Sequence, residues 1–332
     1  MGNGMEQEMN QGVSDITADA VALQERDTFC AQGWLKLVSP AKVNLHLAIG
    51  ARRPDGYHEA ATVMQALNLH DVVYIRRKLP DDAEPEVPSV RMVSCGDVVA
   101  PDLPSASNIA AKAVIALAQL VGGGDTGFEI RIEKNIPAQG GLGGGSSNAA
   151  AALLGTALLW GLAPDDPAIE QAARSLGSDV AFFLHGGCSY YEGTGEKFVR
   201  ALQPSKRAVA LVKPDGGVST AEAYRTFDAD PRPIPEEVAR AVLAAESADD
   251  VALFNNLAPA SEMLMPKLGE VRQWLSSQSG VRGVLLCGSG ATTFAICDDF
   301  ACACQVVAEA RKLGLWARST SFGSLRVMQV SS

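Results

Sequence analysis

The sequence predicts an α+β protein built from two domains. Its 332 residues are enough for two hydrophobic cores of ordinary size. In the first half, a strand that alternates apolar and polar residues leads through a glycine-rich loop into an apolar helix. After residue 205 the segments run strand, helices, strand, strand, helix, strand, which indicates a split βαβ, ferredoxin-like domain. We therefore expect a tail over 1–33, a first domain over 34–204 and a second domain over 205–330.

The elements of the first domain follow from hydrophobic periodicity and from helix start and stop signals. These signals predict strands over 34–50, 71–77 and 127–136, and helices over 107–121 and 146–160. In the third strand, Phe128, Ile130 and Ile132 alternate with charged residues, so one face packs and the other is wet. The second helix is apolar almost all round and is expected inside the domain. The acidic, proline-rich residues 80–88 are expected to form a surface loop.

The second domain is expected to alternate strands with helices. The predicted strands are 208–213, 283–286, 293–297 and 324–330, and the predicted helices are 220–227, 235–245, 258–277 and 302–313. A second glycine-rich turn, 287–291, separates two of these strands. The order of elements carries the ferredoxin-like prediction.

Composition and charge exclude several classes of function. A net charge of -10 argues against nucleic-acid binding, although the tail alone holds six acids and one base. No apolar run reaches the roughly 18 residues that span a bilayer, and the first thirty residues resemble neither a signal nor a transit peptide. We therefore expect a cytoplasmic protein without a membrane or nucleic-acid partner. The seven cysteines form no CxxC pair, and the four histidines are isolated, so free thiols are expected and no metal site.

The most specific motif is the glycine-rich segment between the third strand and the apolar helix. Residues 137–150 read PAQGGLGGGSSNAA, and five glycines in six positions allow the backbone to approach a ligand closely. Successive N–H groups, together with the N-terminus of the following helix, make an anion site. The segment lacks the Lys-Ser/Thr of a Walker A loop and the GxGxxG spacing of a dinucleotide site. A flexible linker is the alternative, but linkers rarely join a clean strand to a buried helix. The segment predicts a phosphate cradle of a different kind.

These residues resemble the phosphate loop of the GHMP kinases. Two further segments are similar to signatures of that family, SPAKVNL at 39–45 and LCGSGATTFA at 286–295. The segments RPDGYHE (53–59), GSDVAFF (177–183) and YEGTGE (191–196) resemble the branch that acts on 4-diphosphocytidyl-2-C-methyl-D-erythritol. The resemblance runs from about residue 39 to 330 with the motifs in order.

The resemblance implies a fold and an activity. The first domain would have the ribosomal protein S5 domain 2-like fold and the second a ferredoxin-like fold. The activity would be transfer of the γ-phosphoryl group of ATP, with Mg²⁺, to the C2 hydroxyl of diphosphocytidyl-methylerythritol in the non-mevalonate isoprenoid route. An RNA-binding role, conceivable from the first domain's fold, is disfavoured by the charge. We expect a monomer or weak homodimer.

Phosphoryl transfer to an alcohol requires a base beside the acceptor hydroxyl, because the hydroxyl loses its proton as its oxygen attacks the phosphorus. Asp179 lies among apolar residues, where a carboxylate is costly without a partner. The alternative is a helix cap, because the segment after it is able to open a short helix. The resemblance makes Asp179 the catalytic base and Lys42 its cationic neighbour, which would keep the carboxylate ionised and offset developing charge.

The resemblance also implies binding residues. For ATP and its phosphates they are Pro137, Gly140, Gly141, Leu142, Gly143, Gly144, Gly145, Ser146, Ser147, Asn108 and Lys134. For the acceptor they are Asn44, Tyr57, His58, Tyr190, Gly288, Ser289 and Gly290. His58 would hydrogen-bond the cytosine, and Tyr57 and Tyr190 would pack on its faces. Taken alone, the aromatic residues are as well explained by a core and His58 by a turn.

Two departures from the family pattern and two alternatives stay open. Ala181 stands where proline is frequent, and Cys287 where a small hydroxyl residue is usual before Gly-Ser-Gly. One alternative is a GHMP kinase for homoserine or a mevalonate derivative, whose acceptors carry no base to hold. The other is a catalytically inactive relative that binds nucleotide as a regulator, which the presence of both Lys42 and Asp179 opposes.

Overall fold

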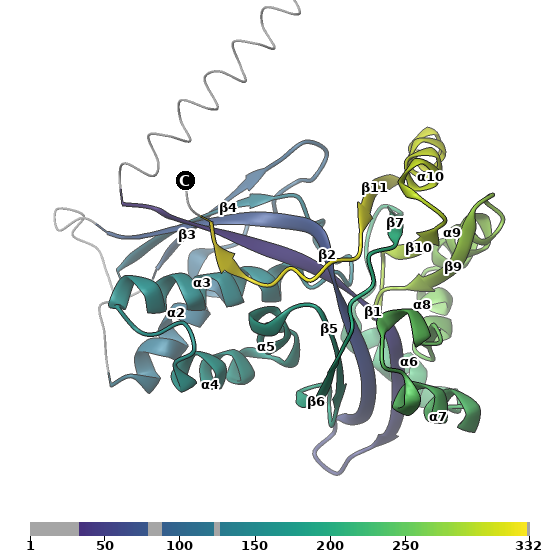
Figure 1. The fold of residues 1–332 in the computed structure, drawn as a ribbon, viewed down its shortest axis with the longest axis horizontal. Helices are drawn as coiled ribbons and strands as arrows, with labels where there is room; N and C mark the ends of the chain where they lie inside the picture. Colours follow the sequence, from purple (N-terminus) through teal and green to yellow (C-terminus); the bar gives the residue numbers. More distant parts are fainter. Residues whose placement is uncertain (1–32, 79–87, 123–126, 331–332) are drawn as a thin grey trace, which may run out of the picture.

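The structure, a computed structural model, describes residues 33–78, 88–122 and 127–330. The predicted acidic tail and the predicted loop 80–88 fall outside these residues, apart from Gly33 and Pro88. The described chain forms two lobes, each with one sheet covered by helices (Figure 1). A mixed α+β fold of two lobes confirms the predicted fold class.

The first sheet has a long antiparallel hairpin as its spine. β1 (Leu35–Arg52) pairs with β2 (His58–Arg77) along almost their whole length. Along the main path the strand order is β12-β1-β2-β4-β3, with β4 (Phe128–Lys134) antiparallel to β2 and β3 (Ser89–Ser94) parallel to β4. Three more strands extend this sheet: β5 (Cys188–Glu192) pairs with β2, β6 (Lys197–Leu202) pairs with β5 (Figure 1), and β8 (Phe254–Asn255) pairs with β1.

Four helices cover one face of this sheet. They are α2 (Ile109–Leu120), α3 (Gly144–Trp160), α4 (Pro167–Leu176) and α5 (Ser178–His185), and a short 3-10 turn, η1 (Ser105–Ser107), precedes α2. β4 alternates buried and half-buried residues as predicted, so Phe128, Ile130 and Ile132 pack beneath the helices. α3 is buried over most of its circumference, which confirms its predicted place inside the domain.

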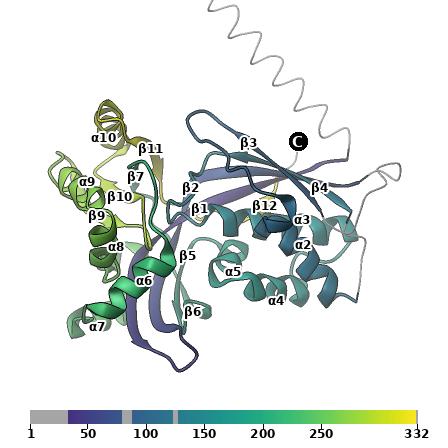
Figure 2. The same ribbon diagram turned by 180° about the vertical axis from the view of Figure 1, so that it is seen from behind.

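The second sheet has the strand order β11-β7-β10-β9, all antiparallel. Its strands are β7 (Ala208–Lys213), β9 (Val281–Leu286), β10 (Thr293–Cys297) and β11 (Trp316–Ser321). The first strand in the chain and the third lie at the centre, as in a ferredoxin-like sheet, so the predicted topology is confirmed. α9 (Lys267–Ser276) and α10 (Phe300–Lys312) pack on one face (Figure 2).

The strand predicted over 324–330 is confirmed only at Met328–Gln329, and it joins the first sheet instead of closing the second. β11 closes the second sheet, and its polar sequence WARSTS concealed it from a search for apolar alternation. The chain then crosses back to the first lobe, where β12 (Met328–Gln329) pairs with β1 (Figure 1). The division into domains at 204/205 stays a prediction.

The predicted helix over 258–277 is two helices. α8 (Ala258–Leu264) ends before α9 begins, because Pro266 has no N–H to continue the helical hydrogen bonds. Two more helices, α6 (Thr220–Ala229) and α7 (Glu236–Ala244), complete this side of the molecule with the 3-10 turn η2 (Ala248–Asp250). α6 packs Ala223 and Phe227 against Leu47 and Ile49 of β1, and so lies along the hairpin.

Candidate active site

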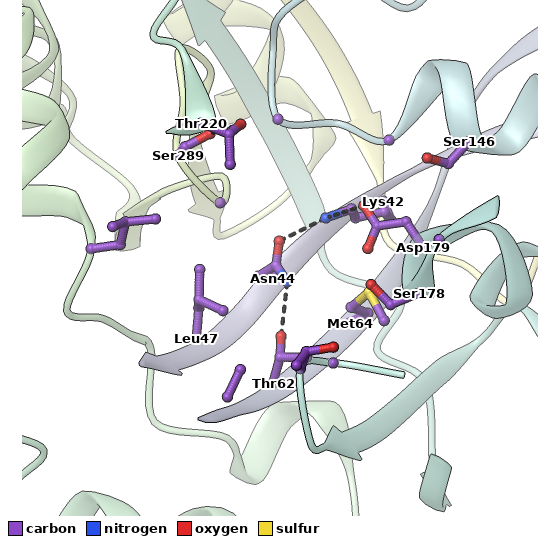
Figure 3. A pocket seen from close by; sticks show the side chains of 18 of the residues that line it. Lys42, Asn44, Leu47, Thr62, Met64, Ser146, Ser178, Asp179, Thr220 and Ser289 are labelled. Atoms are coloured by element: carbon purple, nitrogen blue, oxygen red, sulfur yellow. Dashed lines mark hydrogen bonds and ion pairs between the residues drawn. The ribbon is translucent and has the colours of Figure 1, made fainter. Parts of the chain in front are cut away.

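A cleft of about 370 Å³ opens between the hairpin, α5, α6 and the second glycine-rich turn (Figure 3). β1 contributes Lys42 and Asn44, and β2 contributes Thr62 and Met64 on one face of the hairpin. The other lining side chains that matter for chemistry are Ser146, Asp179, Thr220, Tyr224 and Ser289. Segments far apart in the sequence therefore meet in one polar cavity.

The centre of the cleft is an ion pair between Lys42 and Asp179. The Lys42 ammonium lies 3.2 Å from an Asp179 carboxylate oxygen; Lys42 is buried, whereas the Asp179 side chain keeps 34% of its exposure. Asp179 lies in the first turn of α5, where the helix dipole favours a carboxylate. The N-cap of α5 is Gly177, without a side-chain hydrogen bond, so Asp179 is not the cap of this helix. Its carboxylate is therefore accessible to the hydroxyl group of a substrate bound in the cleft.

A chain of hydrogen bonds fixes the Lys42 ammonium from the other side. Lys42 Nζ donates to Asn44 Oδ1 (2.9 Å), and Asn44 Nδ2 donates to Thr62 Oγ1 (2.8 Å) (Figure 3). Thr62 in turn donates to the carbonyl oxygen of His46 (2.8 Å). The Lys42 ammonium is thus held between the Asp179 carboxylate and the uncharged Asn44 amide oxygen.

The predicted phosphate loop forms the upper wall of the cleft. Gly141 and Gly143 have φ values of 73° and 71°, and a side chain on Gly141 would approach the Cys287 carbonyl oxygen to 2.1 Å. Gly143 is the N-cap of α3 and makes no side-chain cap hydrogen bond. The N–H groups of the first turn of α3 are therefore a ready-made anion site.

A second cleft of about 410 Å³ lies on the other side of this loop. All the predicted loop residues except Ser147 line it, together with Asn108 and Lys134. Gly141, Gly143 and Ser146 line both clefts. The loop is thus the boundary between two cavities, and its anion site faces their junction.

Two residues predicted for the nucleotide side also have structural partners. Asn108 is the N-cap of α2, and its Oδ1 accepts from the Ala110 N–H (3.0 Å). The Lys134 ammonium contacts the fully buried Asp71 carboxylate and donates to Asn148 Oδ1 (3.0 Å). Their contact with a nucleotide stays a prediction.

The comparisons with known proteins agree with this geometry. The family models for the GHMP kinases N terminal domain and the GHMP kinases C terminal match residues 108–187 and 237–317. A protein of Desulfitobacterium hafniense (strain Y51), named 4-diphosphocytidyl-2-C-methyl-D-erythritol kinase, is 38% identical over 79% of this chain and 87% of its own. The chain belongs to the GHMP kinase family.

Solved structures of GHMP kinases share the fold. A crystal structure of 4-(cytidine 5'-diphospho)-2C-methyl-D-erythritol kinase has a TM-score of 0.67 and 31% identity, covering 87% of this chain and all of its own. A homoserine kinase from Cytophaga hutchinsonii has a TM-score of 0.64 at 19% identity, covering 90% and 97% of the two chains. The second likeness concerns the fold alone.

The structure of this GHMP kinase does not bring Tyr190 into the acceptor cleft. Tyr190 pairs with Val63 in the β2–β5 register, whereas the cleft residue Thr62 pairs with Tyr191. Paired residues lie on the same face of a sheet, so Tyr190 faces the opposite side, where it is 3% exposed and packs with Leu202. Burial raises the pKa of its phenol to about 12. Tyr190 therefore does not line the acceptor cleft, and its stacking on a base stays a prediction.

Tyr224 of α6 is the aromatic residue that lines the cleft. Its ring centroid lies 5.3 Å from that of His58, and burial, followed by the nearby Asp179 carboxylate, raises the pKa of its phenol, which stays neutral. His58 is buried at the start of β2, and Tyr57 in the adjoining turn is 66% exposed. The sequence signal for Tyr224 was its four-residue spacing from Thr220, which is one helical turn.

Three further predicted residues differ in what they offer. Ser147 is fully buried, its hydroxyl accepts from Ser39 Oγ (2.8 Å), and its N–H donates to the Gly143 carbonyl, so it lies beneath the loop and lines neither cleft. Gly288 and Ser289 line the cleft, whereas Gly290 shapes the turn through an N–H bond to the Cys287 carbonyl. Burial raises the pKa of the Cys287 thiol to about 12, so this departure from the family pattern adds no charge.

The described part of the chain does not bring metal-binding side chains together. No group of three His, Cys, Asp or Glu residues there is placed to hold an ion. Nor do the described residues include a helix long and apolar enough to cross a membrane.

Proposed function

We propose that this GHMP kinase transfers the γ-phosphoryl group of ATP to the C2 hydroxyl of 4-diphosphocytidyl-2-C-methyl-D-erythritol. The observation that carries the proposal is the pair of clefts that share Gly141, Gly143 and Ser146 of the phosphate loop, one of which holds the Lys42–Asp179 ion pair. One cleft suits a nucleotide and the other an acceptor, so the γ-phosphate and the hydroxyl meet beside Asp179. The relatives named for this substrate match over most of the chain.

Asp179 acts as the base. As the acceptor oxygen attacks the γ-phosphorus, the hydroxyl proton passes to the carboxylate, the bond from the γ-phosphorus to the bridging oxygen breaks, and ADP leaves. Lys42 pairs with the carboxylate and offsets negative charge on the reacting oxygens. Both groups are positioned before the substrates arrive, because the Asn44–Thr62 chain orients Lys42.

The phosphates of ATP bind at the N-terminus of α3. The first-turn N–H groups and the Ser146 hydroxyl face the junction of the clefts. Mg²⁺ suits a site with a hydroxyl and few carboxylates, since it commonly keeps phosphate oxygens and waters as ligands. Ser146 would hold it together with the phosphates, where the ion would neutralise their charge.

The cytidine end of the acceptor lies between α6 and the turn of the hairpin. Tyr224 supplies a ring for stacking within the cleft, and the exposed Tyr57 is free to cover the other face. His58 beside Tyr224 supplies the polar contact. This places the base at one end of the cleft and the methylerythritol near Asp179.

The test is coupled ADP release with ATP, Mg²⁺ and one of three acceptors. We expect turnover with 4-diphosphocytidyl-2-C-methyl-D-erythritol and none above background with homoserine or mevalonate. Turnover of homoserine or mevalonate alone would move the protein to another branch of the family. ATP binding without turnover of any acceptor would instead indicate a nucleotide-binding regulator.

A further inference from the structure

One face of α6 contributes Thr220 and Tyr224 to the lining of the acceptor cleft. Thr220, Tyr224 and Asp228 follow one another at four-residue spacing, so they share a helical face. The Thr220 hydroxyl lies 2.9 Å from the Ser289 hydroxyl at the second glycine-rich turn. At the other end, Asp228 reaches the start of β2. The helix thus connects the phosphate end of the cleft with the end assigned to the base.

Asp228 forms a short hydrogen bond with His58. The distance from His58 Nε2 to Asp228 Oδ1 is 2.6 Å, and the second carboxylate oxygen lies 3.8 Å from the Arg52 guanidinium. His58 is buried, with its ring against Tyr224 and Phe227 of the same helix. The imidazole is therefore held in one place by two rings and one carboxylate.

This bond decides which imidazole nitrogen carries the hydrogen. An ionised carboxylate only accepts hydrogen bonds, so Nε2 must be the donor. In neutral imidazole the other nitrogen, Nδ1, is then an acceptor. Among the described residues, no hydrogen bond engages Nδ1 of His58. His58 lies on the same face of β2 as Ala60 and Thr62, which line the cleft, so its ring stands on the cleft side of the strand, next to the lining residue Tyr224.

We propose that Asp228 is a positioning residue that makes the site specific for an aminopyrimidine. Cytosine presents its exocyclic amine as a donor, whereas uracil presents a carbonyl oxygen at the same position. The Nδ1 acceptor of His58 is able to receive a hydrogen bond from the cytosine amine. With uracil, Nδ1 would face a carbonyl oxygen, and two acceptors form no hydrogen bond. The proposal rests on the proposed function and extends it, because it assigns base selectivity to a residue that does not itself touch the base.

The experiment compares Asp228→Asn and Asp228→Ala with the parent on two acceptors. One is the cytidine diphosphate compound and the other is its uridine diphosphate analogue. Either substitution removes the carboxylate, which can only accept a hydrogen bond from Nε2. The His58 ring is then able to adopt the tautomer with its hydrogen on Nδ1. We expect the ratio of kcat/KM between the cytidine and uridine compounds to fall by about tenfold or more. The change should lie in the KM of the cytidine compound, with kcat and the KM of ATP kept.

A matched control and a spectroscopic readout separate positioning from general damage. Asp230→Asn makes the same chemical change two residues later, at an exposed pair with Arg232 (2.7 Å), and should keep the parental ratio. The ¹⁵N NMR signals of the His58 ring should show a protonated Nε2 in the parent and a shift toward the Nδ1–H form in Asp228→Asn.

Three outcomes are informative. A parental cytidine-to-uridine ratio in both Asp228 variants would overturn the proposal even though the enzyme turns over. A protonated Nδ1 in the parent would overturn it as well, whatever the kinetics. If the parent fails to turn over the cytidine compound, the proposed function fails, while the NMR measurement still decides the His58 tautomer.

Discussion

At the scale of single residues, the aromatic side chain at the proposed base end of the cleft is Tyr224 and not Tyr190. Replacing Tyr224 with alanine removes the stacking surface inside the cleft, a loss of about 1–3 kcal/mol per stacked base. We expect the KM of the cytidine acceptor to rise by roughly 5- to 150-fold, with the KM of ATP unchanged. Steady-state kinetics with each substrate varied in turn measures both.

Tyr190→Ala is the natural companion because it removes the same side chain from the opposite face of the sheet. It should lower thermal stability through a core cavity and leave the acceptor KM near that of the parent. If Tyr190→Ala raised the acceptor KM and Tyr224→Ala did not, the assignment would be reversed.

His46 makes folding stability depend on pH. It is fully buried on β1, and burial lowers its pKa from 6.5 to about 4. Between pH 6.5 and 4 the His46 side chain binds a proton in the unfolded chain but stays neutral in the folded protein. The free energy of unfolding therefore falls as the pH drops through this range, by roughly 3 kcal/mol in all. Urea unfolding across this range should show a weaker pH dependence for His46→Leu.

Phe254→Leu serves as the control for this experiment. The Phe254 ring lies 5.5 Å from His46, so the substitution loosens the same packing but keeps the titrating group. It should lower stability by a similar amount at every pH. An identical pH slope in His46→Leu and the parent would contradict the account.

At the scale of elements, the phosphate loop and α3 act as one unit with Gly143 at their junction. A methyl group on Gly143 would lie 2.7 Å from the Phe183 ring. The alanine backbone would also have to adopt a left-handed φ of 71°. Gly143→Ala should therefore displace the loop and raise the Kd of an ATP analogue at least about tenfold, measured by calorimetry.

The opposite end of α3 provides the comparison. Gly161 has a similar φ of 80°, but nothing lies within 4 Å of the added methyl group. Gly161→Ala should cost about 1 kcal/mol of stability and leave nucleotide affinity unchanged. Equal losses of affinity in the two variants would mean that backbone strain, and not the position of the loop, weakens binding.

The sequence predicted the elements whose signals are local. β4, the glycine loop and α3 follow from alternation, glycine spacing and an apolar composition, and each lies within two residues of its expected bounds. β11 and β12 could not be predicted in the same way, since the first is polar and the second is only two residues long. Their strand character comes from pairing with distant residues, which no local pattern records.

At the scale of the whole molecule, the two lobes hold the active-site loop together. The N–H groups of Ala291 and Thr292 in the second glycine-rich turn donate to the carbonyls of Gln139 and Gly140 (both 3.1 Å). The core residues Val43 and Val209, from the two different sheets, also belong to one apolar cluster. The motifs were predicted from sequence one by one, but only the three-dimensional arrangement shows that they bind one another.

The crossing of the C-terminal residues back to the first lobe predicts an effect on stability. Val327 is 2% exposed in the core of the first lobe, and its N–H donates to the Phe183 carbonyl (2.9 Å). Val327→Ala should lower the free energy of unfolding by about 2 kcal/mol in chemical denaturation. Met328→Ala, at a neighbouring side chain that is 45% exposed, should cost far less. Equal losses of unfolding free energy in the two variants would contradict the prediction that the Val327 side chain stabilises the first lobe.

The placement of Tyr190 also depends on pairing between distant strands. Tyr190 and Tyr191 are adjacent aromatics in a segment that the family resemblance indicated, and the choice of face depends on the register of β5 against β2. Asp179 and Lys42, by contrast, were predicted from motifs and lie 3.2 Å apart in the structure.

The measurement that tests the central claim most directly is phosphoryl transfer by Asp179→Asn. With saturating ATP and 4-diphosphocytidyl-2-C-methyl-D-erythritol, we expect kcat to fall by about 100-fold or more, because the base is lost, while the Kd of ATP stays within about twofold. Asp230→Asn, the exposed control, should keep the parental kcat. Parental turnover by Asp179→Asn would contradict the assignment of this carboxylate as the base.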